Sequence, residues 1–202
     1  MSPPTDLPTS GGSTARRSGR ARLAAGVWNF VQLQVGWLAC VLGAAAGRYW
    51  LGPAVVALLV AHHLYLSRDR RRELEVMGVL AVVGSMADSA QSGLGLLSFE
   101  GARLAWICPA WITALWLHFG SQRETLLQLA YRFPGLAALF GAVGGPLAYW
   151  AGVRLGAASF HPQHPEWVLL SLALVWSLAM PFAGWLAWRS GQVAIRAERA
   201  AA

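Results

Sequence analysis

Asp88 is the residue with the clearest chemical potential, because it lies inside an otherwise apolar run, residues 76–99, within the segment GSMADSAQSGLG. A charged aspartate at the bilayer centre costs about 2.5–3.5 kcal/mol on insertion scales, so it needs compensation. A cationic partner, a hydrogen-bonded cluster or protonation of the carboxyl group would each provide it. A structural clamp between helices is the favoured role, and a functional ion or proton site is the alternative, since intramembrane carboxyl groups often mark such sites.

Small and polar side chains share the helical face of Asp88, since positions three and four apart lie on one side of a helix. Bulky apolar side chains occupy the opposite side. The polar face is therefore expected to meet other helices or a water-filled cavity, and the bulky face to meet lipid. The polar face comprises Ala81, Gly84, Ser85, Gln91, Ser92 and Gly95, and the bulky face Val79, Val82, Val83, Met86, Ala90, Leu94 and Leu97.

The first apolar segment carries a comparable stripe at helical spacing, made of Asn29, Gln32, Gly36, Cys40, Gly43 and Gly47. Its small residues permit close approach of backbones, and its amides can bond across helices. We therefore expect Asp88 to be protonated, or hydrogen-bonded to Ser85, Gln91 or polar groups of this segment. The candidate polar cluster is Asp88, Ser85, Gln91, Ser92, Asn29 and Gln32.

Glycines recur at intervals of three or four in the segment GAVGGPLAYWAGVRLG, residues 141–156, which is typical of tight helix packing. Pro146 removes one backbone donor and disturbs the carbonyl of Ala142, so a kink is expected there. Such a kink can line a site in transporters, but a role in shaping the bundle is the simpler interpretation. The candidate packing and kink residues are Gly141, Gly144, Gly145, Pro146 and Gly152.

Other reactive side chains give weaker patterns. The adjacent pair His62 and His63 is a poor chelator, because neighbouring helical residues point about 100° apart. The segment from His161 through His164 to Glu166 offers zinc ligands but is interrupted by prolines, and His118 is consistent with an interfacial position. No hydrolase, phosphate-binding or dinucleotide motif occurs, and we expect no catalytic residue, metal or cofactor.

The composition identifies the elements that must position these groups. The 202 residues are 56% hydrophobic and only 12% charged, with 11 tryptophans, which is typical of a polytopic membrane protein. The fold is therefore expected to be all-α, a bundle of six transmembrane helices. They are predicted at residues 27–47, 49–66, 76–97, 103–119, 135–156 and 167–188. The cysteines Cys40 and Cys108 fall within apolar runs and are interpreted as buried thiols.

Arginine distribution orients the bundle. Thirteen of the 16 arginines fall on one side of the predicted spans, and only Arg48, Arg103 and Arg154 fall on the other. The positive-inside rule therefore places both termini in the cytoplasm and accounts for the net charge of +7 without nucleic acid. Trp28, Trp50, Trp106, Trp167 and Trp188 fall near span ends, where an aromatic belt is expected.

Three regions follow from this topology. Residues 1–24 form a basic tail, rich in Pro, Ser, Thr, Gly and Arg, that we expect to be disordered. Residues 25–190 form the transmembrane domain, and residues 191–202 a short cytoplasmic tail. Cleavage of the first span as a signal peptide near residues 44–46 is the less favoured alternative, because Asn29, Gln32 and Gln34 weaken its hydrophobic core.

Several segments together resemble a family of small bacterial inner-membrane proteins of unknown function. The resemblance covers roughly residues 27–190. It is carried by Asn29-Phe30, Gln34, Gly36-Trp37, Cys40-Val41, Gly43-Ala44, Asp88-Ser89, Gly95 to Phe99, Pro109, Trp111, Leu115-Trp116, Phe119, Gly144 to Leu147, Tyr149 and Gly152. It implies an inner-membrane location and a link to the fatty-acyl modification of membrane lipids.

Three functions are compatible with these observations. A non-catalytic membrane subunit or scaffold, which binds membrane lipids or another inner-membrane protein, agrees best with the abundant packing motifs. A small transporter or permease would use Asp88 as a midplane ion or proton site, although the second half of the chain has no counterpart of Asp88. A lipid-modifying enzyme would use Asp88 with Asn29, Gln32 or a histidine, and would need a cavity that admits solvent.

Overall fold

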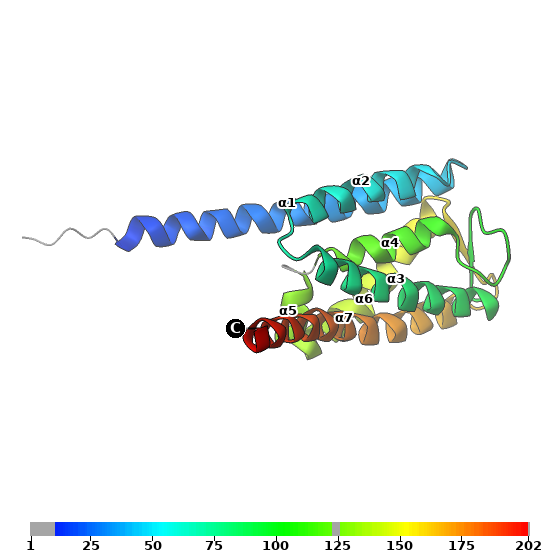
Figure 1. Cartoon of the computed structure of the whole chain (residues 1–202). Helices are drawn as coiled ribbons and strands as arrows, with labels where there is room; N and C mark the ends of the chain where they lie inside the picture. Colours follow the sequence, from blue (N-terminus) through cyan, green and yellow to red (C-terminus); the bar gives the residue numbers. More distant parts are fainter. Residues whose placement is uncertain (1–10, 123–125, 202) are drawn as a thin grey trace, which may run out of the picture.

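The computed structural model describes the backbone of residues 11–122 and 126–201, and the burial of residues 24, 26–122 and 126–191. Within these ranges the chain forms seven α-helices and two short strands (Figure 1). The predicted helical fold class is thus confirmed, with a small sheet added. The elements are α1 (Gly11–Ala45), α2 (Leu51–Leu66), α3 (Arg70–Gly93), β1 (Leu97–Phe99), α4 (Ala110–Gly120), α5 (Gln128–Arg132), α6 (Pro134–Arg154), β2 (Ala158–Phe160) and α7 (Pro165–Ala201).

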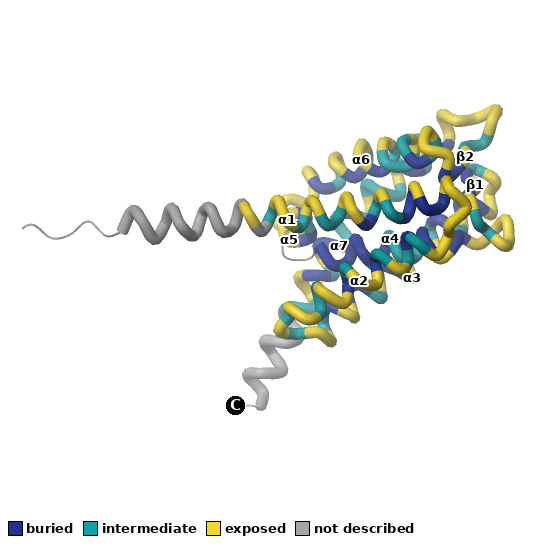
Figure 2. The backbone as a smooth tube through the Cα atoms, turned by 90° about the horizontal axis from the view of Figure 1, so that it is seen from above, coloured by how far each residue is buried: buried dark blue, intermediate teal, exposed yellow. Residues whose placement is uncertain are grey.

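The long helices lie side by side and run back and forth between two ends of the bundle (Figures 1 and 2). Both ends of the described chain and the short helix α5 lie at one end, which we call the terminal end. The strands β1 and β2 lie at the other, which we call the strand end. The most extensive helix packing joins α6 to α7, α3 to α4 and α1 to α2.

The strand end is closed by a two-stranded antiparallel sheet, in which Leu97 pairs with Phe160, Ser98 with Ser159 and Phe99 with Ala158. Leu97 and Phe99 are buried while Ser98 between them is exposed, as the alternation of side chains along a strand requires. Gly95 and Gly156 precede the two strands with φ of 72° and 86°. This left-handed conformation suits glycine and turns the chain out of the preceding helix into the strand.

Helix α4 is short and central. Its 11 residues extend about 16 Å, roughly half the hydrocarbon thickness of a bilayer. It follows Pro109, which is extended with ψ of 161° and marks the helix start. Helices α1, α2 and α3 all pack against it, and Trp111, Trp116 and Phe119 are among its buried residues. The core of the molecule therefore forms around α4.

The predicted spans agree with the helices in places and need correction in others. The prediction for 49–66 corresponds to α2, and that for 135–156 to α6. Helix α3 begins earlier than the predicted 76–97 and ends at Gly93, because the chain turns at Gly95 into β1. The segment 100–109, assigned in part to the span 103–119, has no helix and instead forms a loop before α4.

Three of the described helical segments are long and apolar enough to cross a membrane, namely Gly26–Ala45, Pro134–Arg154 and Pro165–Gly191. Helix α2 is apolar but shorter. Many large apolar side chains on the outside of the bundle are exposed, including Leu58, Phe140 and Leu174. A surface of this kind is a lipid-facing surface rather than a water-facing one. These observations indicate a membrane protein.

The predicted terminal tails coincide only in part with the described residues. Residues 1–10 lie outside them, while the backbone of residues 11–24 forms the start of α1. At the other end, α7 continues without a break past residue 190 to Ala201. The boundary predicted at residue 190 is therefore not an end of secondary structure.

Candidate functional site

The orientation predicted for α3 is confirmed. Asp88 is only 1% exposed, whereas Val82, Met86 and Leu94 on the opposite side are 60%, 67% and 75% exposed. Two predicted members depart from their faces because the helix ends at Gly93: Gly95 is exposed in the turn, and Leu97 is buried in β1. The small and polar face of α3 thus carries the Asp88 carboxylate into the bundle.

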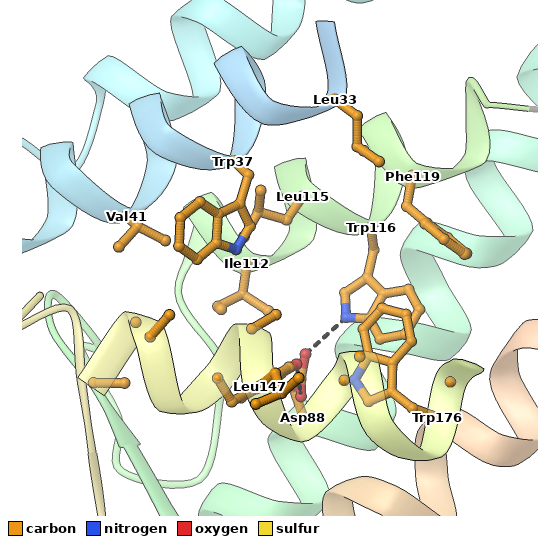
Figure 3. A pocket seen from close by; sticks show the side chains of 18 of the residues that line it. Leu33, Trp37, Val41, Asp88, Ile112, Leu115, Trp116, Phe119, Leu147 and Trp176 are labelled. Carbon is orange, nitrogen blue, oxygen red and sulfur yellow. Dashed lines mark hydrogen bonds between the residues drawn. The ribbon is translucent and has the colours of Figure 1, made fainter. Parts of the chain in front are cut away.

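The carboxylate of Asp88 receives hydrogen bonds from two aromatic side chains on other helices. Trp116 on α4 donates from Nε1 to Oδ2 at 2.7 Å, as Figure 3 shows, and Tyr149 on α6 donates from Oη to Oδ1 at 2.6 Å. Both distances are typical of bonds to an anionic acceptor. Asp88 therefore joins α3, α4 and α6 at one buried point.

An aromatic cluster surrounds this point. The indole of Trp116 stacks on that of Trp176 from α7, with ring centroids 4.7 Å apart and planes 14° from parallel. Phe119 meets both indoles edge to face. The stack fits because Gly84 lies against Trp116 and Gly145 against Trp176, each with a hypothetical Cβ less than 2.5 Å from the indole. Glycine at these two positions is required by space.

A cavity of about 500 Å³ adjoins the Asp88 site, between α1 and α6 and against α4 (Figure 3). Its walls are mainly apolar and aromatic, with Asp88 and Gln34 as the polar exceptions. The volume is within the range of small-molecule sites. The labelled side chains in Figure 3 show α1 contributing Leu33, Trp37 and Val41 on one side and α6 contributing Leu147 on the other.

The cavity exists because α1 and α6 do not close on each other. Helix α1 packs against α2 and α4, whereas α6 packs against α7. The packing of α1 against α4 and against α2 depends on glycines. Gly36 of α1 faces the ring of His118 on α4, and Gly52 of α2 faces Cys40 on α1. Phe140 and Leu147 of α6 line the gap between α1 and α6 and are also 62% and 58% exposed, so the cavity wall extends to the outer surface of the bundle.

The candidate polar cluster predicted from the sequence is not a single cluster in the structure. Instead of bonding to Asp88, Ser85 donates to Thr113 on α4, and Gln91 accepts from Ser171 on α7. Ser92 is buried on α3, and its Oγ has no partner among the described residues. Ser85, Asp88 and Gln91 lie at different positions along α3, and each therefore meets a different neighbouring residue.

The predicted polar residues of α1, Asn29 and Gln32, also lie away from Asp88. The carbonyl oxygen of Gln32 accepts a hydrogen bond from Nε2 of His118 at 3.0 Å, and Asn29 is half-buried one turn nearer the terminal end. Neither appears as a hydrogen-bond partner of Asp88. Of the six predicted cluster residues, Asp88 is the one that lines the cavity.

The predicted glycines of α6 fall into two groups. Gly141 and Gly145 pack tightly on α7, since an added Cβ would lie within 2.5 Å of Trp176 atoms. Gly144 and Gly152 have no atom within 4 Å of an added Cβ, although both line the cavity. Pro146 lies inside α6, which continues through it from Pro134 to Arg154.

The histidines occupy three separate places. His63 pairs with the buried Glu73 at 3.1 Å, and His118 contacts α1. At the strand end the rings of His161 and His164 stack 5.6 Å apart, and His164 lies 3.4 Å from Glu166. Within the described ranges, no three His, Cys, Asp or Glu side chains gather as a metal site.

The sequence interpretation missed the partners of Asp88. Trp116 and Tyr149 carried a usable signal, because a buried indole or phenol with one polar atom needs an acceptor, and Asp88 is the single carboxylate within the apolar run of residues 76–99. The indole nitrogen of Trp176 is also buried but has no hydrogen-bond partner among the described residues, and the stack on Trp116 is the contact that joins Trp176 to this site.

Comparison with known proteins identifies the family of the chain. No curated protein and no solved structure matches it. A family model described as protein of unknown function (DUF2878) matches residues 26–182, which include α2, α3, α4, both strands, α6 and the residues around Asp88. This range agrees with the resemblance noted in the sequence, and the chain belongs to the DUF2878 family of proteins of unknown function.

Proposed function

We propose that this protein is a multi-pass protein of the bacterial inner membrane that holds an acyl chain of a membrane lipid in the cavity between α1 and α6. In this role it is a non-catalytic membrane subunit. The observation that carries the proposal is the apolar cavity of about 500 Å³ that lies between two helices apolar enough to span the bilayer and has exposed residues of α6 in its wall.

The chemistry of the walls favours a hydrocarbon occupant. Leu33, Val41 and Ile112 provide aliphatic surface, and the aromatic rings of Trp37 and Phe99 enclose it. Phe140 and Leu147 belong to the cavity wall and are also exposed on the outside of the bundle, so the surrounding lipid tails are the nearest source of a ligand. A lipid chain can enter from the bilayer without crossing a polar surface.

Six crossings with both termini in the cytoplasm fit this role. Trp28 and Trp188 are exposed towards the terminal end, and Trp50, Trp106 and Trp167 towards the strand end, as two interfacial belts require. The short helix α4 is compatible with a crossing because protein surrounds it. Cys108 donates its backbone N–H to Ser89, and Trp111 donates from Nε1 to the carbonyl of Glu100, so polar groups at its start are satisfied internally.

A permease that uses Asp88 is the second candidate, supported by the position of this carboxylate in the cavity wall. The hydrogen bonds from Trp116 and Tyr149 favour a fixed structural carboxylate over an exchanging ion site. The same two bonds weigh against a lipid-modifying enzyme in which Asp88 transfers a proton. If the protein is linked to fatty-acyl modification, its part is to present or store an acyl chain for another inner-membrane protein.

The experiment fills the cavity without disturbing the fold. Gly144→Trp places a large ring in open space beside the cavity, since nothing lies within 4 Å of an added Cβ. Gly78→Trp on α3 is the matched control, because Gly78 also has open space and does not line the cavity. Both full-length proteins are reconstituted with a phospholipid that carries a photoreactive group along one acyl chain.

Irradiation is expected to crosslink the lipid to α1 and α6 residues of the wild-type protein and of Gly78→Trp. Peptide mass spectrometry locates the adducts. In Gly144→Trp, crosslinks at the cavity residues Leu33, Trp37 and Tyr149 are expected to disappear, while those on the outer surface, including the exposed Leu147, persist. Equal crosslinking of these three residues in both variants would show that their adducts do not depend on an open cavity and would reject the proposal, as would the absence of adducts at these residues in the wild-type protein.

A further inference from the structure

A second pocket lies at the strand end, separate from the acyl-chain cavity. Its volume is about 620 Å³, and it is lined by the start of α2 and by the loop between β1 and α4. Trp111 contributes to both pockets and stands between them. The lining residues used below are Tyr49, Trp50, Arg103, Leu104 and Ile107.

Arg103 is the charged residue in this lining. It is exposed, and it forms no ion pair and no side-chain hydrogen bond with another residue of the described ranges. Glu100 is near in sequence but does not line the pocket. The guanidinium group therefore offers all of its donors to a ligand, and its planar geometry suits the oxygens of a phosphate group.

The remainder of the pocket is amphipathic. Leu104 and Ile107 are exposed aliphatic residues, and Trp50 is 68% exposed with an indole N–H. Tyrosine and tryptophan are the residues that proteins place at the level of lipid headgroups. An inorganic phosphate ion would gain nothing from these apolar walls, whereas the glycerol backbone and first chain carbons of a phospholipid would bury them.

The loop that carries Arg103 is held at one end by the turn before α2 and at the other by α3. Gly101 has a φ of 77°, and its Cα side lies against the ring of Tyr49, where an added Cβ would come within 2.5 Å of a ring carbon. Cys108 at the far end of the loop bonds to Ser89 through its backbone N–H at 3.0 Å. Arg103 is thus presented from a loop fixed at both ends.

We propose that this pocket binds the headgroup phosphate of an anionic membrane phospholipid, with Arg103 as the cationic partner and Tyr49 and Trp50 as its aromatic wall. The site is independent of the acyl-chain cavity. It recognises a phosphodiester at the interface of the leaflet that faces the strand end.

The experiment compares Arg103→Gln with Arg154→Gln in the full-length protein. Arg154 is the matched control, since it lies at the same end of the bundle, stacks 5.9 Å from the ring of Trp150 and does not line the pocket. Delipidated protein in detergent is titrated with phosphatidylglycerol, and bound lipid is counted by native mass spectrometry. Loss of one arginine at a membrane surface is expected to weaken binding about fivefold.

The expected result is weaker phosphatidylglycerol binding in Arg103→Gln, unchanged binding in Arg154→Gln, and partial recovery in Arg103→Lys, which keeps the charge but loses the planar set of donors. Equal binding by the Gln variants and the wild-type protein would overturn the proposal. A parallel titration adds inorganic phosphate at the same concentration. Full displacement of the lipid by phosphate would show a site for the free ion and would overturn the assignment to a lipid headgroup, whereas persistence of bound lipid supports it.

Discussion

Helix α6 presents two kinds of glycine to its surroundings. Gly141 and Gly145 lie against Trp176 of α7, and no side chain fits at either position. Gly144 and Gly152 border open space beside the cavity, and any small side chain fits there. Both kinds belong to one glycine-rich segment in which the sequence pattern suggested a single packing face. The difference shows that one helix can combine a tightly packed side with a side left open for a ligand.

Asp88 of α3 contributes both to the packed side of α6 and to the cavity on its open side. Through Tyr149 it is bonded to α6, and through Trp116 it supports the indole stack for which Gly145 leaves room. At the same time it lines the cavity. The predictions below test this division, beginning with the substitution that should have the largest effect.

Gly145→Leu is expected to prevent folding, or to lower the free energy of unfolding by at least about 3 kcal/mol, because overpacking against a fixed neighbour has few ways to relax. The added Cβ would lie 2.2 Å from Trp176, whose ring is already stacked on Trp116. Thermal unfolding of the purified protein in detergent measures the effect. Gly144→Leu, one residue away, should unfold at the wild-type temperature, and similar losses for both would contradict the division.

Asp88→Leu is expected to lower the free energy of unfolding by about 2–3 kcal/mol, because it leaves the buried donors of Trp116 and Tyr149 without an acceptor. Asp88→Asn keeps one acceptor oxygen and should lose about half as much. Chemical unfolding monitored by tryptophan fluorescence compares the two variants. An Asp88→Leu protein as stable as the wild type would show that the carboxylate is not a clamp.

Tyr149→Phe removes one hydrogen bond to Asp88 and is expected to cost about 1 kcal/mol, the typical net value of such a bond. Tyr65→Phe on α2 provides the control, since Tyr65 is exposed. Parallel unfolding curves would separate the two variants. If Tyr149→Phe and Tyr65→Phe unfold alike, the bond seen between α3 and α6 contributes no stability.

Gly152→Ala should have the smallest effect and the opposite sign. Alanine is favoured over glycine in a helix interior by roughly 0.5–1 kcal/mol, and Gly152 has room for a methyl group. A small rise in unfolding temperature is therefore expected, together with unchanged lipid crosslinking. A loss of stability would show that α6 is packed on this side as well.

The sequence was sufficient to predict the helical class, the approximate position of most helices and the inward direction of Asp88. Those features depend on local quantities, namely the length of apolar runs and the spacing of side chains around a helix. The contrast between buried Asp88 and exposed Met86, two positions away, follows directly from that spacing.

The partners of Asp88 could not be predicted in the same way. Trp116 and Tyr149 lie 28 and 61 residues away in the chain, and their contact depends on how far each helix is rotated and shifted along its neighbours. The loop 100–109 was also missed in part, because Leu104, Trp106 and Ile107 are as apolar as a helix would be. Hydropathy measures the preference for lipid and does not measure whether backbone donors and acceptors are paired.

The small sheet at the strand end has a mechanical consequence. Besides the three paired positions, Glu100 donates its backbone N–H to Ala157 and His161 donates to Leu96, so the connection after α3 is tied to the connection after α6. These backbone hydrogen bonds hold the first and second halves of the chain together at the strand end. A motion that separates α3 from α6 is therefore expected to pivot at the strand end and to be greatest at the terminal end.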